Sequence, residues 1–351
     1  MDEIDDLPLR RTRRRNVIVM PNRPSPNDLT AQLGARIVGQ PHAMEKIVPY
    51  VRTHQAGLAP EGRPIGVFLL LGPTGTGKTR TVEALAEVLH GTPKNILKVD
   101  CGEFQMEHEV AKLVGAPPGY LGHRETQPML TQAKLTSLAS ERCNISIVLF
   151  DEIEKAAPSM TRLLLGVLDK AALRLGDNNI VNFERTLIFL TSNLGSQGIM
   201  KELNPKFGFP AGMEPTREEM SSRLASIAMS AARRQFSPEF MNRIDAIVTY
   251  QPLSEESLAE ILEQQLDELQ AHILRRLGDR AFRVLVPKKT KSFFLRKGTS
   301  AEYGAREIKR TIHRHLMQPL ANMIADGLIE PGMSVYVGLS EGDDEVVLKA
   351  A

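Results

Sequence analysis

Tryptophan is absent from the 351-residue sequence, and tyrosine is scarce, with five residues. Proteins that bind single-stranded nucleic acid stack bases on aromatic side chains, so this shortage argues against such a surface. Only two cysteines are present, Cys101 and Cys143, which provide neither a disulfide framework nor a cluster of metal ligands. This use of cysteine is typical of a reducing compartment, and we predict a cytoplasmic protein.

The sequence also lacks a strong charge bias and a long apolar run. Its 44 basic and 42 acidic residues leave a formal net charge of +2, so no global field attracts nucleic acid. No apolar run is long enough to cross a bilayer, and the start MDEIDDLPLRR is no secretory signal. We therefore expect neither a membrane nor a nucleic acid as a partner. The length suits two domains with sizeable cores.

Three parts are predicted along the chain. Residues 1–33 have an acidic start, a cluster of arginines and a stretch rich in proline and asparagine, which predicts a flexible tail. A docking arm for an acidic partner or for nucleic acid is the alternative. Residues 34–251 alternate between strand-like and helix-like patterns, and residues 252–351 are mostly helix-like.

Five short apolar runs predict a parallel sheet that is buried on both faces. They are Ile65–Leu71, Ile96–Val99, Ile145–Phe150, Leu187–Leu190 and Ile244–Tyr250. Helical patterns lie between them, as at Thr79–Leu89 and Ser159–Leu168, so we predict an α/β fold. A further helical pattern starts at Pro41, and we expect Pro49 to kink or interrupt it.

The last hundred residues predict a smaller, mostly helical domain with short closing strands. One apolar stripe ends at Gly278 and consists of Leu258, Leu262, Leu266, Leu269, Ile273 and Leu277. A second stripe consists of Ile308, Ile312, Leu316, Leu320 and Ile324. Strand-like segments are Phe282–Val286, Val335–Gly338 and Val346–Leu348, and Lys201–Pro215 in the first domain predicts a mobile loop.

The motif GPTGTGKT at residues 72–79 follows an apolar run and precedes a helical pattern. This is the context that a phosphate-binding loop requires, although a glycine-rich turn without a ligand is the alternative. We predict that Lys78 reaches the β- and γ-phosphates of ATP and that the Thr79 hydroxyl binds Mg²⁺. The predicted nucleotide-binding residues of the loop are Gly72, Pro73, Thr74, Gly75, Thr76, Gly77, Lys78 and Thr79.

Asp151 and Glu152 end the apolar run that precedes them, at the strand end where an open α/β sheet binds ligands. Neighbouring side chains on a strand point in opposite directions, so the two acids can have separate roles. Asp151 is predicted to hold Mg²⁺, and Glu152 to orient and polarise the attacking water. A plain strand end is the alternative.

From about Arg36 to Val337 the sequence resembles the C-terminal AAA+ module of the Clp/Hsp100 unfoldases, as in ClpB, ClpA and ClpC. The matching segments, in the family's order, are RPIGVFLLLGPTGTGKT, VGAPPGYLG, IVLFDEIEKAAP, TLIFLTSNLGS, FSPEFMNRIDAIV and YGAREIKR. The resemblance implies an AAA+ P-loop NTPase with a five-stranded parallel sheet and a smaller helical lid domain. It also implies ATP and Mg²⁺ as cofactors and a homo-oligomeric ring, expected to be a hexamer, that acts on proteins.

The resemblance implies roles for further residues. Ile37 and Val38 would lie against the adenine, or make ordinary core contacts. Asn193 would be the sensor-1 residue that bonds the γ-phosphate or the attacking water. Arg306 would be the sensor-2 residue that links γ-phosphate occupancy to domain rotation, or a helix-surface arginine. Arg243 would be the arginine finger for a neighbour's ATP, with a salt bridge to Asp245 as the alternative.

Tyr120, in GAPPGYLG, would be the pore-loop aromatic residue that grips a substrate, or would fold back on its own domain. The sequence after it, GHRETQ, departs from the family's usual GYEEGG, and Asp169–Leu175 departs from the acidic, glycine-rich second pore loop. These departures bring threading into question, not ATP chemistry. Phe207–Phe209 loosely resembles the segment that docks such unfoldases on the ClpP protease, but begins with an aromatic residue.

We predict an ATP-dependent unfoldase that pulls proteins through a central pore. The alternative is a nucleotide-switched scaffold that assembles one partner complex, and a third hypothesis is a nucleic-acid remodeller that uses the arginine-rich tail. The sequence holds one ATPase module without the family's N-terminal or middle domains, so we expect no collaboration with Hsp70. Substrate selection would then depend on the tail, the pore, an adaptor or a protease partner.

Overall fold

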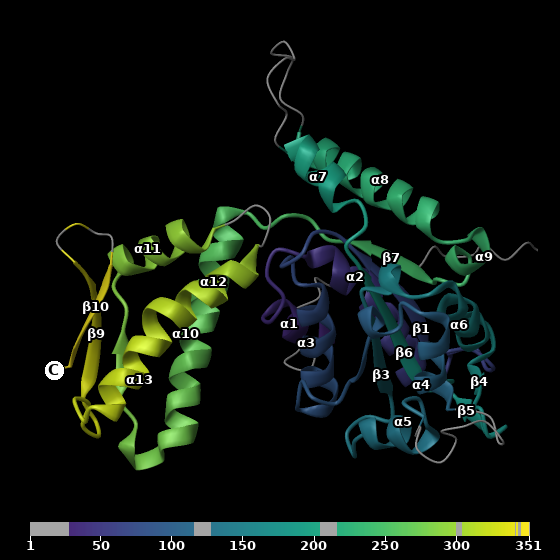
Figure 1. Ribbon diagram of the computed structural model, residues 1–351, viewed down its shortest axis with the longest axis horizontal. Coiled ribbons are helices and arrows are strands. Elements are labelled where there is room, and N and C mark those ends of the chain that lie inside the picture. Colours follow the sequence, from purple (N-terminus) through teal and green to yellow (C-terminus); the bar gives the residue numbers. More distant parts are fainter. Residues whose placement is uncertain are drawn as a thin grey trace, which may run out of the picture.

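Five parallel strands form the central sheet of the larger domain, in the order β2-β3-β6-β1-β7. The computed structural model describes residues 28–115, 128–203, 216–299, 304–340, 342 and 345–350. The predicted five-stranded parallel sheet is confirmed (Figure 1). The strands are β1 (Gly66–Leu71), β2 (Leu97–Asp100), β3 (Ser146–Asp151), β6 (Thr186–Ser192) and β7 (Ala246–Thr249).

Both faces of this sheet are covered by helices. Successive side chains of a strand point to opposite faces, and those of the central strands are apolar on both faces, so each face must be buried. In β1, Phe68 and Leu70 pack with α1 (Leu29–Gly34), α2 (Pro41–Gln55) and α3 (Lys78–His90). Val67, Leu69 and Leu71 of the same strand belong to the core on the opposite face. That core includes residues of α4 (Ala111–Val114), α5 (Gln132–Leu138), α6 (Pro158–Lys170), α7 (Ser196–Leu203), α8 (Arg217–Gln235) and α9 (Pro238–Met241).

Short elements complete the large domain. A two-stranded antiparallel hairpin of β4 (Ala172–Arg174) and β5 (Ile180–Asn182) follows α6. Single 3-10 turns lie at Cys101–Glu103, Glu107–Val110 and Ile153–Lys155. The last of these turns comes directly after the two acids at the end of β3, so it shapes the backbone around them.

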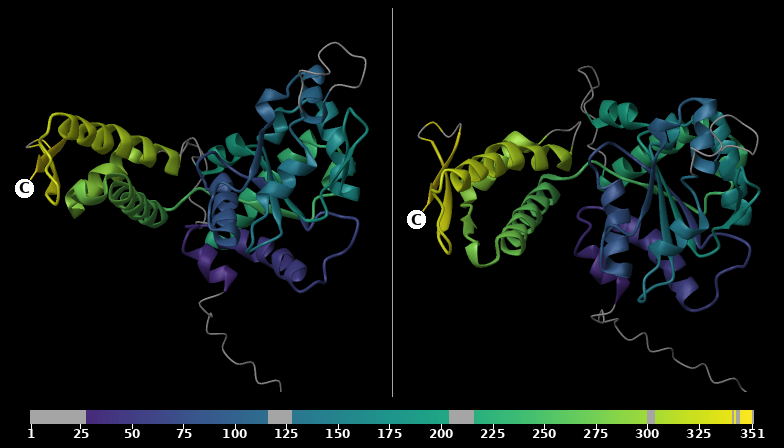
Figure 2. Two further views of the ribbon diagram at one scale, coloured as in Figure 1. Left: turned by 90° about the horizontal axis from the view of Figure 1, so that it is seen from below. Right: turned by 60° about the horizontal axis from the view of Figure 1, so that its bottom comes forward.

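The smaller domain is mostly helical, as predicted, and its core is separate from those of the large domain. Its helices are α10 (Glu255–Leu277), α11 (Lys288–Gly298), α12 (Ala305–Ile312) and α13 (Gln318–Ala325), with a π-helical turn at His313–Met317 joining the last two. A three-stranded sheet holds β8 (Arg283–Leu285), β9 (Ser334–Leu339) and β10 (Val346–Ala350). This sheet lies at the end of the small domain away from the large domain (Figure 2).

Two local predictions are wrong in part. Helix α2 passes through Pro49 without an interruption, because Val48 and Val51 on either side are buried in the core and hold the helix in place. Helix α1 occupies the last part of the range predicted as a tail, since Asp28 caps it and Leu33 is only 2% exposed. The rest of the predicted tail lies outside the described residues. None of the helices in the described ranges combines the length and apolar character needed to cross a membrane.

Candidate active site

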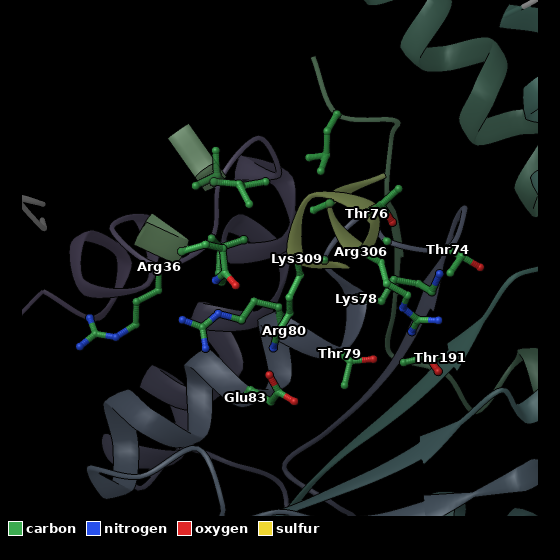
Figure 3. A pocket seen from close by; sticks show the side chains of 18 of the residues that line it. Arg36, Thr74, Thr76, Lys78, Thr79, Arg80, Glu83, Thr191, Arg306 and Lys309 are labelled. Carbon is green, nitrogen blue, oxygen red and sulfur yellow. The ribbon is translucent and has the colours of Figure 1, made fainter. Parts of the chain in front are cut away.

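A cleft of about 330 Å³ lies where the two domains meet. The large domain contributes the loop after β1, the start of α3 and the ends of β3 and β6, and the small domain contributes α10 and the first two turns of α12 (Figure 3). Most of the predicted nucleotide-binding and catalytic residues line this one cleft. They are Ile37, Val38, Thr74, Gly75, Thr76, Gly77, Lys78, Thr79, Asp151, Glu152, Asn193 and Arg306.

The loop after β1 depends on its glycines. Gly72, Gly75 and Gly77 have φ angles of 147°, 76° and 104°, which residues with side chains rarely adopt. A Cβ atom on Gly72 would lie 2.5 Å from the carbonyl oxygen of Tyr250, so this position has no room for a side chain. Helix α3 begins directly after the loop, at Lys78. The loop therefore leads into the positive end of a helix, which favours bound anions.

The Lys78 side chain crosses the inside of the loop and is only 8% exposed. Its Nζ atom donates to the carbonyl oxygens of Gly72 at 2.6 Å and Pro73 at 2.9 Å, and to Oδ1 of Asn193 at 2.8 Å. Gly72 and Pro73 thus do not line the cleft. Their carbonyl groups instead accept hydrogen bonds from the Lys78 ammonium group. Burial lowers the pKa of Lys78 to about 8, although the carboxylate of Glu154 acts in the opposite direction.

The two acids at the end of β3 are held by Thr191, on the neighbouring strand β6. The Thr191 hydroxyl donates to the Asp151 carboxylate and accepts the backbone N–H of Glu152 at 3.0 Å. Glu152 has φ 57° and ψ 50°, a left-handed conformation that costs a residue with a side chain about 1–2 kcal/mol. Such strain persists only where the surroundings enforce it, and it turns Glu152 out of the strand.

Each acid also contacts a lysine. Lys98 Nζ lies 2.7 Å from Asp151, and Lys155 Nζ lies 2.5 Å from Glu152. Burial raises the pKa of Asp151, but the hydrogen bonds from Lys98 and Thr191 outweigh it and hold this pKa below its usual value. Asp151 is therefore ionised near neutral pH and attracts a cation to its carboxylate.

Asn193, which follows β6, joins the lysine of the loop to the second acid. Its Oδ1 atom accepts from Lys78, and its Nδ2 group donates to Oε1 of Glu152 at 3.2 Å. Its backbone N–H donates to Oε1 of Glu154 at 2.9 Å, which fixes the residue's position. The sequence predicted that Asn193 lies beside the acids. Its hydrogen bonds join the side chains of Lys78, Asn193 and Glu152 in one network.

The small domain closes the cleft from the other side. The backbone N–H of Ala305, at the start of α12, donates to the Gly75 carbonyl oxygen at 3.2 Å. A Cβ atom on Gly304 would lie 2.8 Å from the same oxygen, so a glycine allows α12 to approach the loop. Arg306 and Lys309 of α12 both line the cleft, Arg306 near Thr76 and Lys78 of the loop and Lys309 on the side of Arg80 (Figure 3).

Arg243 lies outside the cleft. Its guanidinium donates to the Glu239 carbonyl oxygen at 2.9 Å and forms ion pairs with the Glu239 carboxylate at 3.2 Å and with Asp169 at 3.8 Å. Asp245 instead pairs with Arg63 at 3.3 Å and accepts the Val67 backbone N–H at 2.8 Å. The alternative of a salt bridge between Arg243 and Asp245 is therefore wrong, and Arg243 does not reach its own chain's cleft.

Tyr120 and Phe207–Phe209 lie outside the described residues, so their predicted roles stay predictions. The residues that sequence reasoning missed are chiefly those that hold the predicted ones. They include Thr191, Lys98, Lys155, Glu154 and Lys309. Thr191 stands in the segment TSN that drew attention to Asn193, but only the pairing of β3 with β6 shows that it contacts both acids.

Comparison with protein families gives two adjacent matches. Residues 63–247 match the family described as AAA domain (Cdc48 subfamily), and residues 253–337 match the C-terminal, D2-small domain of ClpB protein. The first match spans more than half of the chain and contains the loop, both acids and Asn193. The second begins two residues before α10 and contains Arg306.

Comparison with individual proteins also finds ClpB. The chain is 38% identical to the chaperone protein ClpB of Aquifex aeolicus over 315 residues, which are 90% of this chain and 30% of that protein. It is also 38% identical to ClpB of Meiothermus ruber, over 88% of this chain and 34% of that protein. The chain thus spans about a third of the length of these relatives.

Two solved structures share the fold. One is a closed-state cryo-EM reconstruction of Hsp104 with ATPγS and FITC casein, with a TM-score of 0.74, and it covers 92% of this chain. The other is an extended S. cerevisiae Hsp104–casein complex with a TM-score of 0.76, which covers 91%. Both Hsp104 chains are 28% identical to this chain, and the matched region is 51% of the length of each of them.

Proposed function

This chain belongs to the AAA domain family and matches the C-terminal ATPase module of ClpB, and from this premise we propose that it is an ATP-driven protein unfoldase. In this proposal a ring of identical subunits, most simply a hexamer, binds and hydrolyses ATP between its domains and pulls on protein substrates. The observation that carries the ATPase part is the network that joins Lys78, Asn193 and Glu152 in one cleft. Phosphoryl transfer requires positioned charges more than covalent chemistry, and this network supplies them.

The residues around Asp151 fit a magnesium ion. Mg²⁺ in nucleotide sites needs one or two protein oxygens in addition to phosphates, and the Thr79 hydroxyl and the Asp151 carboxylate both line the cleft. The pKa of the Asp151 carboxyl group is held below its usual value, so the carboxylate is ionised and can hold a cation, which would displace the Lys98 ammonium group now 2.7 Å away. When bound, the ion would neutralise charge on the β- and γ-phosphates.

Each remaining residue then has one task. Lys78 binds the β- and γ-phosphates from inside the loop, and Glu152 accepts the proton of the attacking water and orients it. Asn193 holds this water, or the γ-phosphate, against Glu152. Ile37 and Val38 supply an apolar surface for the adenine, and Arg306 brings a positive charge from the small domain.

The binding site is tested by Lys78→Ala. We expect this change to weaken ATP binding by at least about 100-fold, because it removes a buried charge that faces the phosphates. Titration with a fluorescent ATP analogue measures the affinity, and Lys94→Ala, an exposed lysine of the same domain, is the matched control. An affinity equal to that of the wild type in Lys78→Ala would refute the nucleotide site.

The low pKa of Lys78 gives a pH prediction. Its pKa of about 8 means that the free enzyme loses the ammonium charge as pH rises through 8, well below the usual pKa of lysine. Phosphate binding needs that charge, so kcat/KM for ATP should be halved near pH 8 and approach a tenfold fall per pH unit at higher pH. A stopped assay in buffers of constant ionic strength between pH 6.5 and 9.5 measures this. A profile that stays flat to pH 9.5 would contradict the assignment.

The unfoldase part of the proposal rests on the resemblance, and Tyr120 tests it. In a threading motor the aromatic ring grips the substrate while ATP chemistry occurs elsewhere, so Tyr120→Ala should keep basal ATPase activity. It should abolish ATP-dependent unfolding of a tagged test protein, whereas Tyr120→Phe, which keeps the flat apolar ring, should unfold it normally.

The scaffold hypothesis predicts a different result. A scaffold switched by nucleotide should bind one folded partner in an ATP-dependent manner, and neither Tyr120 variant should affect that binding. Unfolding and ATPase rates measured in parallel for the wild type and both variants therefore separate the two functions. If Tyr120→Ala unfolds the test protein as fast as the wild type, threading is excluded and only the ATPase proposal stands.

A further inference from the structure

The Gln40 side chain connects the phosphate-binding loop to the linker between the domains. It is 6% exposed, and its Nε2 group donates to the Thr76 carbonyl oxygen at 3.3 Å and to the Gln251 carbonyl oxygen at 2.8 Å. Its Oε1 atom accepts the Gln251 backbone N–H at 3.3 Å. Both donors and the acceptor of the amide are thus used, and each is bonded to backbone rather than to water.

The linker is the short segment between β7 and α10 that contains Tyr250 and Gln251. The Tyr250 backbone N–H donates to the Leu71 carbonyl oxygen at 2.7 Å, and its hydroxyl donates to Oγ1 of Thr81 at 2.8 Å. Leu71 precedes the phosphate-binding loop and Thr81 lies in the first turn of α3, so the linker is bonded on both sides of the loop. Gln40 supplies the bond to the loop itself.

The residue before Gln40 meets the other end of the linker. Gly39 has φ +74°, and a Cβ atom on it would lie 2.8 Å from Oγ of Ser257 and 3.1 Å from Leu253. Ser257 is in the first turn of α10, the helix that carries the small domain. The space between Gly39 and the start of α10 therefore has no room for a side chain, so the Gly39–Gln40 backbone lies close to this helix.

We propose that Gln40 is a positioning residue that couples the conformation of the phosphate-binding loop to the orientation of the small domain. The coupling runs from the Thr76 carbonyl group through the Gln40 amide to the backbone of Gln251. When the loop adjusts to bound phosphates, the Thr76 peptide group moves, and Gln40 transmits that movement to the linker. Two sites joined in this way influence each other reciprocally. The inference rests on the proposed nucleotide binding.

Two substitutions remove the connection in different ways. Gln40→Met keeps the length of the side chain and removes all three hydrogen bonds. Gln40→Asn keeps the amide but shortens the side chain by one methylene group, so it weakens the reach to Thr76 and Gln251 without a buried charge and reports independently if Gln40→Met folds poorly. Gln270→Met is the matched control, because Gln270 bridges the Phe282 carbonyl oxygen and the Val284 N–H entirely within the small domain.

The experiment measures binding and domain movement separately. Spin labels at Lys94→Cys in the large domain and Asp279→Cys in the small domain, in a Cys143→Ser background, report the interdomain distance with and without an ATP analogue. A fluorescent analogue gives the dissociation constant for the same proteins. Steady-state kinetics give kcat and KM, because a lost coupling lowers kcat at an unchanged dissociation constant.

We expect both Gln40 variants to bind the analogue within about threefold of the wild type and to lose more than about half of the distance shift that the analogue causes. The control should retain both. The inference is overturned if the Gln40 variants keep the full shift, if the control loses as much, or if the wild type binds the analogue without any shift. A wild type that does not bind nucleotide would instead refute the proposed function.

Discussion

Replacement of Glu152 by glutamine should lower kcat for ATP hydrolysis by about 10²–10⁴-fold while ATP and Mg²⁺ still bind. Glutamine keeps the shape of the side chain and removes the charge that polarises water. Glu152 is not a phosphate-binding group in the proposed site, so affinity depends on Lys78 and the loop instead. The pair of results, slow turnover with tight binding, is what distinguishes a lost base from a lost binding site.

The measurement is a single-turnover assay beside a binding titration. Glu103→Gln serves as the control, since Glu103 is an exposed carboxylate of the same domain. Turnover by Glu152→Gln within about twofold of the wild type would show that another group activates the water. Loss of binding and turnover together would mean that Glu152 supports the fold of the site rather than its chemistry.

The surroundings of Glu152 explain why a small change there should have so large an effect. Its left-handed backbone is held by the Thr191 hydroxyl, and its carboxylate meets Asn193 and Lys155. The hydrogen bond to Glu152 raises the pKa of Lys155, so this lysine is charged and holds the carboxylate. In the proposed mechanism the pairing of Glu152 with Lys155 would have to loosen before Glu152 accepts a proton from water.

The sequence predicted the parts of this site that lie on local motifs. The loop at residues 72–79 and the acids at the end of β3 are recognisable because their chemistry requires contiguous residues, and residues 74–79 line one cleft with both acids. The contacts of Thr191 were not predicted, because they depend on β3 and β6 being neighbours, and those of Gln40 were not predicted, because its partners are far away in the sequence. Gln40 meets Gln251, 211 residues later, and no local pattern indicates such a pair.

The fold was also predictable from contiguous residues, and the errors in its prediction were confined to single elements. Buried strands such as β1 are apolar on both faces, so they appear in the sequence as uninterrupted runs. Helix α2 was misjudged at Pro49, because a missing backbone hydrogen bond is a local cost that burial of Ile47, Val48 and Val51 outweighs. A burial contribution of about 1.5–3 kcal/mol per large apolar side chain is enough to do so.

Arg243 is expected to act on the ATP of a neighbouring subunit. In its own chain its guanidinium is held by Glu239 and Asp169, and it does not line the cleft. An arginine that stabilises the charge of the transferring phosphoryl group is worth about 10³–10⁵ in rate. We therefore expect Arg243→Ala to bind ATP normally and to be nearly inactive as a pure protein.

Mixtures of two inactive variants test whether Arg243 acts between subunits. Lys78→Ala subunits have a defective cleft and an intact Arg243, while Arg243→Ala subunits have the reverse. In a mixed ring, some interfaces pair an intact cleft with an intact Arg243 of the adjacent subunit, so ATPase activity should reappear and pass through a maximum as the ratio varies. Rings of either variant alone should stay inactive at every concentration.

The control is the mixture of Arg243→Ala with a doubly substituted Lys78→Ala, Arg243→Ala chain, which offers no complete interface and should stay inactive. Native mass spectrometry with one variant isotopically labelled establishes that mixed rings form. If mixed rings form and no ratio restores turnover, Arg243 does not complete its neighbour's site, and its contacts with Glu239 and Asp169 are structural. Restored turnover in the control mixture would show that some other residue supplies the missing charge.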